Sequence, residues 1–229
     1  MNWRWNEFRQ TGRNYGDAAE VGRYDKTHAD FRDTIAEATD ALDLLDVRPD
    51  WRLLDIGCGT GAFAVTAAMV CREIIGIDVS EPMLSVARLK ASCLGLTNVG
   101  FKHQGFLSYE HAGLPLDAVA TTFALHHLPC FWQAVALRRI HGMLAPGGYF
   151  LLCDVVISDG ARLFEPIESF IDEQARAGGD FLREDAEGHF RDEFSTFDWV
   201  IEGMLVRAGF TILKHHVKSH VISTYLCRK

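Results

Sequence analysis

The sequence predicts an α/β fold in which a doubly wound, mainly parallel sheet lies between two layers of helices. Residues 53–70 have the pattern of a buried strand, a glycine-rich turn and a helix, and 73–80 that of a second strand ending in an acid. The last two apolar runs, 210–217 and 220–227, are joined by only Lys218 and Ser219. So short a link predicts an antiparallel hairpin at the C-terminal end of the chain.

The glycine-rich turn indicates a ligand site. Glycines at 57, 59 and 61 let a ligand lie against bare backbone, and the helix that follows points its positive dipole end at that ligand. Asp55 ends an otherwise apolar strand, where an unpaired charge is costly. It therefore needs a partner, which a cationic or multiply hydrogen-bonding ligand or the amides of the turn would supply.

The spacing of the turn separates it from the dinucleotide-binding motif. That motif has the pattern G-x-G-x-x-G, whereas this turn has G-x-G-x-G, and Ala62 stands where the third dinucleotide glycine belongs. Asp78 lies 21 residues after Gly57, near the offset of about 20 residues at which an acid accepts hydrogen bonds from ribose hydroxyls. The alternative is that Asp78 only caps the next helix.

Length and composition predict a single globular domain. The chain has 229 residues, 48% of them hydrophobic, and a formal charge of −8, which argues against binding nucleic acid through general phosphate attraction. No apolar run approaches the roughly 20 residues that span a bilayer, and the first residues lack a signal-peptide core, so a cytoplasmic location is expected. Six cysteines without a C-x-x-C pair predict reduced thiols rather than disulfides or a zinc site.

The remaining elements follow from periodicity and turn signals. Helices are predicted at 28–47, with Ile35, Ala38 and Leu42 on its apolar face, at 81–95 and at 131–144; strands are predicted at 99–104, 117–123 and 149–156. Residues 145–148, Ala-Pro-Gly-Gly, predict a turn before the last of these strands, in which Asp154 alone is charged.

The stretch 158–198 interrupts the alternation of strands and helices. An apolar helical stripe including Leu163 and Phe164 precedes a break at Gly178 and Gly179. Ser195 is then expected to cap a helix that Gly209 ends.

Two adjacent histidines, His126 and His127, follow the strand at 117–123. They stand at the carboxyl edge of a parallel sheet, where ligands bind, and either could take a proton from a substrate. The alternative is that one anchors the loop while the other faces solvent. His215 and His216 point to opposite faces of a strand and cannot readily share an ion, so no metal site is expected.

Two motifs carry a family resemblance. Residues 55–61, D-I-G-C-G-T-G, resemble the first motif of class I S-adenosylmethionine-dependent methyltransferases. Residues 124–129, A-L-H-H-L-P, are similar to a sequence common in small-molecule methyltransferases of the quinone-methylase type, and they differ from the N-P-P-Y sequence of amino-group methylases. The resemblance is strongest between residues 51 and 157.

This resemblance implies a Rossmann-like, seven-stranded sheet in the order 3-2-1-4-5-7-6 with an antiparallel last strand, in a three-layer αβα sandwich. It implies S-adenosylmethionine as cofactor, S-adenosylhomocysteine as product, and methyl transfer to a small-molecule acceptor by in-line displacement. The cofactor-binding residues that it implies are Asp55, Gly57, Cys58, Gly59, Gly61, Asp78, Val79, Met83, Gly105, Phe106 and Phe123.

By the same resemblance, residues 1–27 form a cap over the cofactor and 158–198 an insert over the substrate site. Tyr15, Tyr24 and Phe106 are candidates to face the sulfonium, and His126 or His127 to act as a base. Many relatives have an adenine-binding aspartate after the third strand; here the sequence is Gln104-Gly105-Phe106, so backbone groups are expected to take that role. Two alternatives are a non-catalytic cofactor-binding protein and a nicotinamide-dependent dehydrogenase, against which the glycine spacing and the terminal hairpin argue.

Overall fold

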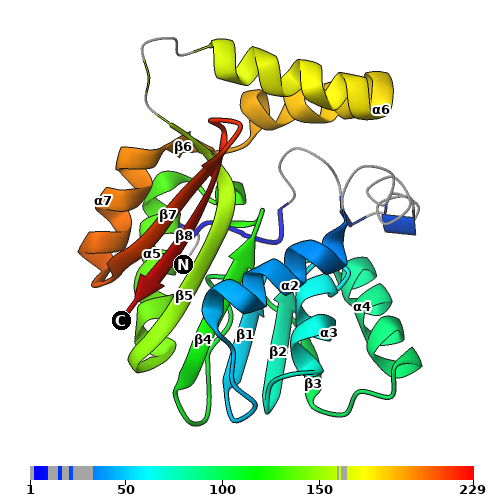
Figure 1. The fold of residues 1–229 in the computed structure, drawn as a ribbon, viewed down its shortest axis with the longest axis vertical. Coiled ribbons are helices and arrows are strands. Elements are labelled where there is room, and N and C mark those ends of the chain that lie inside the picture. The colour runs from blue at the N-terminus through cyan, green and yellow to red at the C-terminus, as the bar shows by residue number, and fades with distance from the viewer. Residues whose placement is uncertain (1–2, 10–14, 17–20, 23–32, 159, 161–163) are drawn as a thin grey trace.

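The computed structural model describes residues 3–9, 15–16, 21–22, 33–158, 160 and 164–229. Its centre is one mixed sheet in the order β3-β2-β1-β4-β5-β8-β7 (Figure 1). The strands are β1 Arg52–Ile56, β2 Glu73–Asp78, β3 Val99–His103, β4 Leu116–Thr122, β5 Leu144–Ile157, β7 Thr211–Lys218 and β8 Ile222–Arg228. A two-residue strand, β6 (Thr196–Phe197), pairs with β5 outside this path.

The predicted strand order is confirmed once β6 is counted. The strands expected as sixth and seventh are β7 and β8, and β8 lies antiparallel between β5 and β7. The turn between them has positive φ at Ser219 and His220, as a tight hairpin requires. β1, β2, β4 and the first part of β5 run parallel, so their carboxyl ends share one edge of the sheet.

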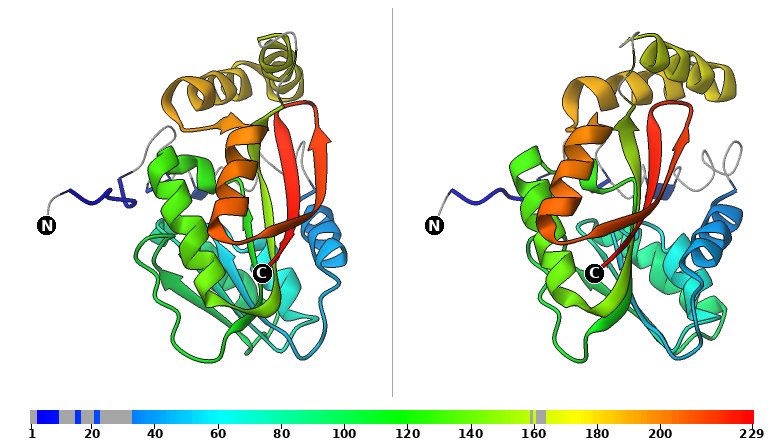
Figure 2. Two further views of the ribbon diagram at one scale, coloured as in Figure 1. Left: turned by 90° about the vertical axis from the view of Figure 1, so that its left-hand side faces the viewer. Right: turned by 60° about the vertical axis from the view of Figure 1, so that its left-hand side comes forward.

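Helices cover both faces of the sheet, as the three-layer prediction requires (Figure 2). One face carries α2 (Thr34–Leu45), α3 (Ala62–Ala68) and α4 (Glu81–Cys93), and the other carries α5 (Cys130–Met143) and α7 (Asp198–Ala208). A 3-10 turn, η1 (Leu125–His127), follows β4. None of the helices in the described ranges is long and apolar enough to cross a bilayer.

Each face of the sheet has its own apolar core because neighbouring strand residues point to opposite sides. Leu54 and Phe150 belong to the cluster that includes Leu137 of α5 and Leu205 of α7. Leu53 belongs to the cluster under α2 and α3. Burial on both faces explains why these strands are nearly continuous apolar runs.

Two predicted helix ends are confirmed. The Ser80 side chain accepts a hydrogen bond from the Met83 amide at the start of α4, and Gly209 ends α7 in the left-handed conformation. The predicted helix at 28–47 begins later, at Thr34, because the Asp33 carboxylate caps it; residues 28–32 lie outside the described ranges. Ile35 is exposed, whereas Ala38 and Leu42 are buried as expected.

The turn predicted at 145–148 is wrong. β5 begins at Leu144, which pairs with Leu116, and the register shifts before Ala118 pairs with Tyr149. Residues 145–148 have no register partners of their own among the described strands, and Gly147 has a φ of +77°, so the Pro-Gly-Gly segment forms a bulge inside β5 instead of a separate turn before it.

The cap predicted at Ser195 is also wrong. Phe197 precedes the first residue of α7, Asp198, and no side chain caps the helix there. The Ser195 hydroxyl instead lies 2.6 Å from Nε2 of His189. This tertiary contact and the pairing of β6 displace the local capping box.

The long helix α6 (Glu165–Asp192) lies beyond the carboxyl edge of the sheet (Figures 1 and 2). It loses helical geometry at Gly178 and Gly179, the predicted break, and buries Leu182 and Ala186 in its second half. Phe164, from the predicted stripe, is exposed, and Leu163 lies outside the described residues.

All six cysteines are free. Cys58, Cys71 and Cys227 are buried, as expected of thiols in apolar segments, whereas Cys93 and Cys130 are exposed.

Candidate functional site

The glycine turn lies at the carboxyl edge of the sheet, between β1 and α3. Gly57, Gly59 and Gly61 have φ of 71°, 53° and 82°, which side chains with a Cβ rarely adopt. The Gly57 amide donates to the Ile77 carbonyl at 2.8 Å, so the turn is fixed to β2. A Cβ on Gly57 would lie 2.3 Å from Cβ of Ala124, so the turn also packs closely against the loop that follows β4.

Asp55 stands under this turn with its side chain almost fully buried. It is 3% exposed, and its Oδ2 has no hydrogen-bond partner among the described residues. Burial and the neighbouring Asp78 raise the pKa of Asp55 to about 8, against a lowering contribution from the Ala64 amide. A buried carboxylate oxygen without a partner fits a ligand that brings a cationic amine, as S-adenosylmethionine does.

Asp78 ends β2 and holds the glycine turn. Its Oδ2 accepts from the Gly59 amide at 2.8 Å, and its Oδ1 accepts from the Ser80 amide at 2.7 Å. Burial raises the pKa of this carboxyl despite the two amides. A carboxylate has about four lone-pair sites, so both oxygens retain capacity for ribose hydroxyls. Ser80, and not Asp78, caps α4, and the contacts of Asp78 with the two amides are compatible with the predicted ribose role.

The other predicted cofactor residues differ in how deeply they are buried. Val79 and Gly105 meet beside Asp78, since a Cβ on Gly105 would lie 2.7 Å from Cγ1 of Val79. Phe123 is half-buried with a φ of 51°. Cys58, Met83 and Phe106 are buried, with 4–8% exposure, which makes their side chains part of the core that shapes the site.

The N-terminal segment supplies a carboxylate that the sequence reasoning missed. Glu7 accepts hydrogen bonds from the Leu107 and Ser108 amides at 2.8 and 2.7 Å, and its Oε2 lies against Gly105. The Glu7 carboxylate thus lies beside the loop after β3, although the sequence of that loop contains no acidic residue before Glu110. The Gly105 amide, expected to be available for a ligand, donates to the Ser108 hydroxyl instead.

Tyr15 also reaches this edge. Its carbonyl accepts from the Ser80 hydroxyl at 2.5 Å, and its ring lies edge-on to His127 with centroids 6.4 Å apart. Tyr15 therefore links the cofactor-binding residues to the histidine pair. Tyr24, the other tyrosine expected here, lies outside the described residues.

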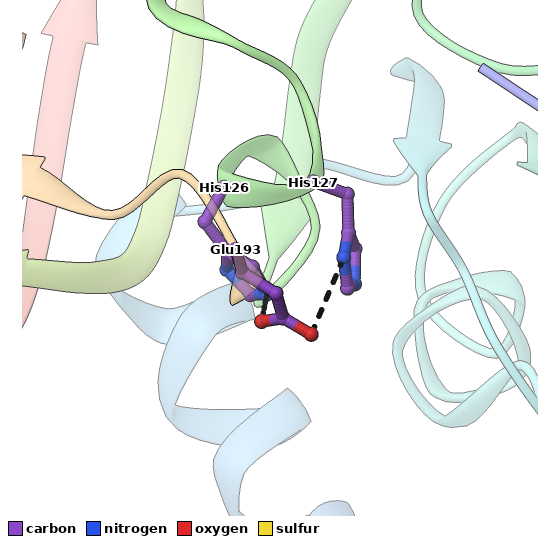
Figure 3. Close-up of side chains that lie close together, drawn as sticks. All are labelled: His126, His127 and Glu193. Atoms are coloured by element: carbon purple, nitrogen blue, oxygen red, sulfur yellow. Dashed lines mark ion pairs between the residues drawn. The ribbon is translucent and has the colours of Figure 1, made fainter. Parts of the chain in front are cut away.

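His126 lies at the centre of a buried cluster of histidines and carboxylates (Figure 3). Its Nδ1 contacts Oδ1 of Asp154 on β5, and its backbone amide donates to Oδ2 of the same carboxylate at 3.2 Å. Its Nε2 lies 3.2 Å from Oε2 of Glu193, which follows α6. The loop after β4, strand β5 and the residue that follows α6 therefore meet at the His126 imidazole.

His127 and His189 complete the cluster around Glu193. The two carboxylate oxygens of Glu193 face different rings: Oε1 lies 3.7 Å from Nδ1 of His127, and Oε2 contacts Nδ1 of His189 (Figure 3 shows the first). The ring centroids of His127 and His189 lie 4.3 and 4.6 Å from that of His126. The side chain of His127 is 33% exposed, against 7% for His126.

The carboxylates and the two adjacent histidines shift one another's pKa values. Burial lowers the pKa of His126, but Asp154 and Glu193 more than offset this and raise it to about 10. Burial alone would raise the pKa of both carboxyls. The pKa of Asp154 is nevertheless lowered because His126 stabilises its charged form, and that of Glu193 is lowered because His126 and His189 do so. Burial and the adjacent His126 lower the pKa of His127 to about 4. The two predicted histidines thus hold opposite protonation states at neutral pH.

Sequence reasoning missed Asp154, His189 and Glu193 as members of the site. Asp154 did carry a signal, because it is the one charged residue in an apolar central strand. His189 and Glu193 lie four residues apart near the end of α6, on a segment that only tertiary structure brings to the sheet.

Comparisons with known proteins agree with this geometry. Residues 53–148 match the family model described as a methyltransferase domain. The chain is 28% identical over 182 residues to an uncharacterized methyltransferase, GK2543, of Geobacillus kaustophilus, covering 79% of each chain. It is 29% identical over 130 residues to a demethylmenaquinone methyltransferase of the same organism, covering 55% of each, so it spans about half the length of that relative.

A solved structure extends the likeness to the whole chain. The magnesium protoporphyrin IX methyltransferase of Synechocystis PCC 6803 with bound S-adenosylmethionine superposes with a TM-score of 0.68 at 14% identity, covering 100% of both chains. At this identity the likeness establishes the fold. The antiparallel β8 and the G-x-G-x-G turn also depart from the dinucleotide-binding alternative. The methyltransferase-domain match over residues 53–148, the methyltransferase relatives and the shared fold together support a class I S-adenosylmethionine-dependent methyltransferase, with S-adenosylmethionine as the cofactor that this type implies.

Proposed function

We propose that this protein transfers a methyl group to a small organic acceptor that binds beside His127. The observation that carries the proposal is the contact between the two halves of the site: Gly57 of the cofactor turn packs on Ala124, and His126 follows two residues later. A donor and an acceptor held on either side of this contact can be aligned for in-line transfer with water excluded. Alignment and exclusion of water supply most of the rate in such a reaction.

The cofactor side consists of residues from the ends of β1, β2 and β3 and from the N-terminal segment of the chain. The Asp55 carboxylate, unpartnered at Oδ2, would hold the cationic amine, and Asp78 would accept from the ribose hydroxyls. Val79, Gly105 and the Glu7 carboxylate would border the adenine. When bound, S-adenosylmethionine supplies an electrophilic methyl group on its sulfonium, and the Tyr15 ring, 6.4 Å from that of His127, is an aromatic candidate to face it.

The acceptor side consists of the histidine loop and the insert 158–198. We assign His127 to the acceptor because its side chain is a third exposed, and His126 to positioning because two carboxylates enclose it. Glu193 and His189 come from the end of α6, so the insert would shape the acceptor pocket. A relative named for demethylmenaquinone and a formal charge of −8 both support a small organic acceptor over a nucleic acid.

The test is transfer of label from methyl-labelled S-adenosylmethionine. The full-length protein is incubated with labelled cofactor and small-molecule fractions of cell extracts, and products are separated from the cofactor by chromatography. We expect a labelled small molecule together with S-adenosylhomocysteine, and much less of both with a folded Asp78→Ala variant when the labelled cofactor is kept below the dissociation constant of that variant. Tight cofactor binding with no labelled product across varied extracts would instead support a non-catalytic cofactor-binding protein.

A further inference from the structure

We infer that His126, His127 and Glu193 form a binding site for one divalent transition-metal ion, with Zn²⁺ as the best match. Each residue offers one donor atom, and the three atoms lie within 4.8 Å of one another. Two imidazole nitrogens and one carboxylate oxygen form a donor set that zinc uses in catalytic sites, where the fourth position stays open. Figure 3 shows the Glu193 carboxylate between the two rings.

The distances between donor atoms support coordination. Zinc bonds of about 2.0–2.2 Å in a tetrahedron place two donor atoms about 3.3–3.6 Å apart. Oε2 of Glu193 lies 3.2 Å from Nε2 of His126, and Oε1 of the same carboxylate lies 3.7 Å from Nδ1 of His127, so each ring nitrogen has a Glu193 oxygen close to that separation. A hydrogen bond between such atoms is about 2.7–3.2 Å long, so hydrogen bonding does not account for the His127 distance.

The neighbours of these donors also match a metal site. Metal-binding histidines usually donate their second ring nitrogen to a carboxylate, which fixes the ring. The Asp154 carboxylate contacts Nδ1 of His126 in this way, so the other ring nitrogen, Nε2, faces Glu193. Glu193 is in turn held by Nδ1 of His189, whose Nε2 lies 2.6 Å from the Ser195 hydroxyl. Asp154 thus fixes the ring of His126, and His189 fixes the carboxylate of Glu193.

The charges of the cluster favour a cation. The side chains of Asp154 and Glu193 are only 3% and 7% exposed, so two negative charges stand in a desolvated region. Their ion partners among the described residues are all histidines. A buried carboxylate needs close compensation, and a divalent ion bound at Nε2 would displace the proton that His126 otherwise holds there and take over that compensation.

This inference differs from the expectation that the chain has no metal site. That expectation considered the cysteines and the strand histidines at 215 and 216, whereas these ligands come from η1 and the end of α6. Metal binding does not depend on the proposed function. Its consequence does: an oxygen or sulfur atom of the acceptor would take the open position and ionise more easily there.

The experiment uses the full-length, tag-free protein, dialysed against a chelator and titrated with Co²⁺ and Zn²⁺ without cofactor or acceptor. Co²⁺ uptake is followed by its visible absorption and Zn²⁺ uptake by equilibrium dialysis with elemental analysis. The variants are His127→Gln, Glu193→Gln and Asp154→Asn. His216→Gln is the matched control, because His216 is exposed on β7 outside the cluster.

We expect one ion per chain, with the strong visible absorption of Co²⁺ at low coordination number. His127→Gln and Glu193→Gln should weaken binding by more than about a hundredfold, and Asp154→Asn, which changes an outer contact, by about 10- to 100-fold. His216→Gln should bind as the unchanged protein does.

Failure of the unchanged protein to take up either ion would overturn the inference, and so would equal uptake by His127→Gln and Glu193→Gln. If Glu193→Gln does not fold, His127→Gln decides, because that side chain is partly exposed and its replacement leaves the buried pair intact. Because the titration contains neither cofactor nor acceptor, its failure is distinguishable from failure of the methyl-transfer assay.

Discussion

His126 is joined to Asp154 at two points. Its Nδ1 contacts one carboxylate oxygen, and its backbone amide donates to the other at 3.2 Å. Asp154 lies on β5 and is 2% exposed, so a single buried carboxylate fixes both the ring and the loop that follows β4. The same loop packs against the glycine turn, so this pair connects the acceptor side of the site to the cofactor side.

Removing Asp154 should destabilise the whole fold. Asp154→Ala removes one of the two carboxylates that compensate the buried His126 and leaves its Nδ1 without that partner, and we expect the free energy of unfolding to fall by about 3–5 kcal/mol. Urea denaturation followed by circular dichroism measures this. In a double-mutant cycle with His126→Ala, the double variant should lose less than the sum of the single variants. Strict additivity would mean that the two side chains do not interact.

The glycine turn offers a matched pair of substitutions. Gly57 and Gly59 both have positive φ, but a Cβ would meet Ala124 only at Gly57; at Gly59 nothing lies within 4 Å. Gly59→Ala should cost only backbone strain, about 1–2 kcal/mol. Gly57→Ala adds a steric clash of about 1–3 kcal/mol. Thermal and urea unfolding of both variants compares them, and equal losses would place the clash in doubt.

Asp78→Ala should weaken binding of the cofactor. The variant loses the acceptor expected for the ribose hydroxyls and the group that holds the Gly59 amide. We expect a loss of about 1.5–3 kcal/mol, or roughly tenfold to hundredfold in affinity. Isothermal titration calorimetry with S-adenosylhomocysteine measures it. Unchanged affinity in a folded variant would show that the ribose binds elsewhere.

Cofactor affinity should rise with pH. The pKa of Asp55 in the ligand-free chain is raised to about 8, so below that pH its carboxyl is mostly protonated and poorly suited to a cationic amine. As pH rises from about 6 to about 8 the carboxylate forms, and affinity should increase by up to about tenfold per pH unit. Titrations at several pH values measure this slope. Asp55→Asn should flatten it, and an unchanged slope in that variant would assign it to another group.

The fold was predictable because its signals are local. Each apolar strand, the glycine turn and the acid that ends the second strand is recognisable from a few neighbouring residues, and the tight link at 218–219 determines the hairpin. Errors arose where tertiary contacts compete with local preference. Leu144 and Tyr149 both pair with β4, so the Pro-Gly-Gly segment between them becomes a bulge inside β5. The Ser195 hydroxyl, expected to cap α7, contacts His189 instead.

The site was predictable only in part. Asp55, Asp78 and the glycines share one motif, and the histidine pair follows a strand end, so their positions follow from topology. Glu193 and Glu7 reach the site from opposite ends of the chain, through contacts that periodicity does not encode. The charged Asp154 within an apolar strand was the one local sign that the histidines have a buried partner.

The most direct test of the account is calorimetric titration of the full-length protein with S-adenosylmethionine, S-adenosylhomocysteine and NAD. Binding of the first two with one molecule per chain, weakened in Asp78→Ala, together with no binding of NAD, is the predicted result. Binding of NAD without either S-adenosyl compound would contradict the assignment of the glycine turn and of Asp78.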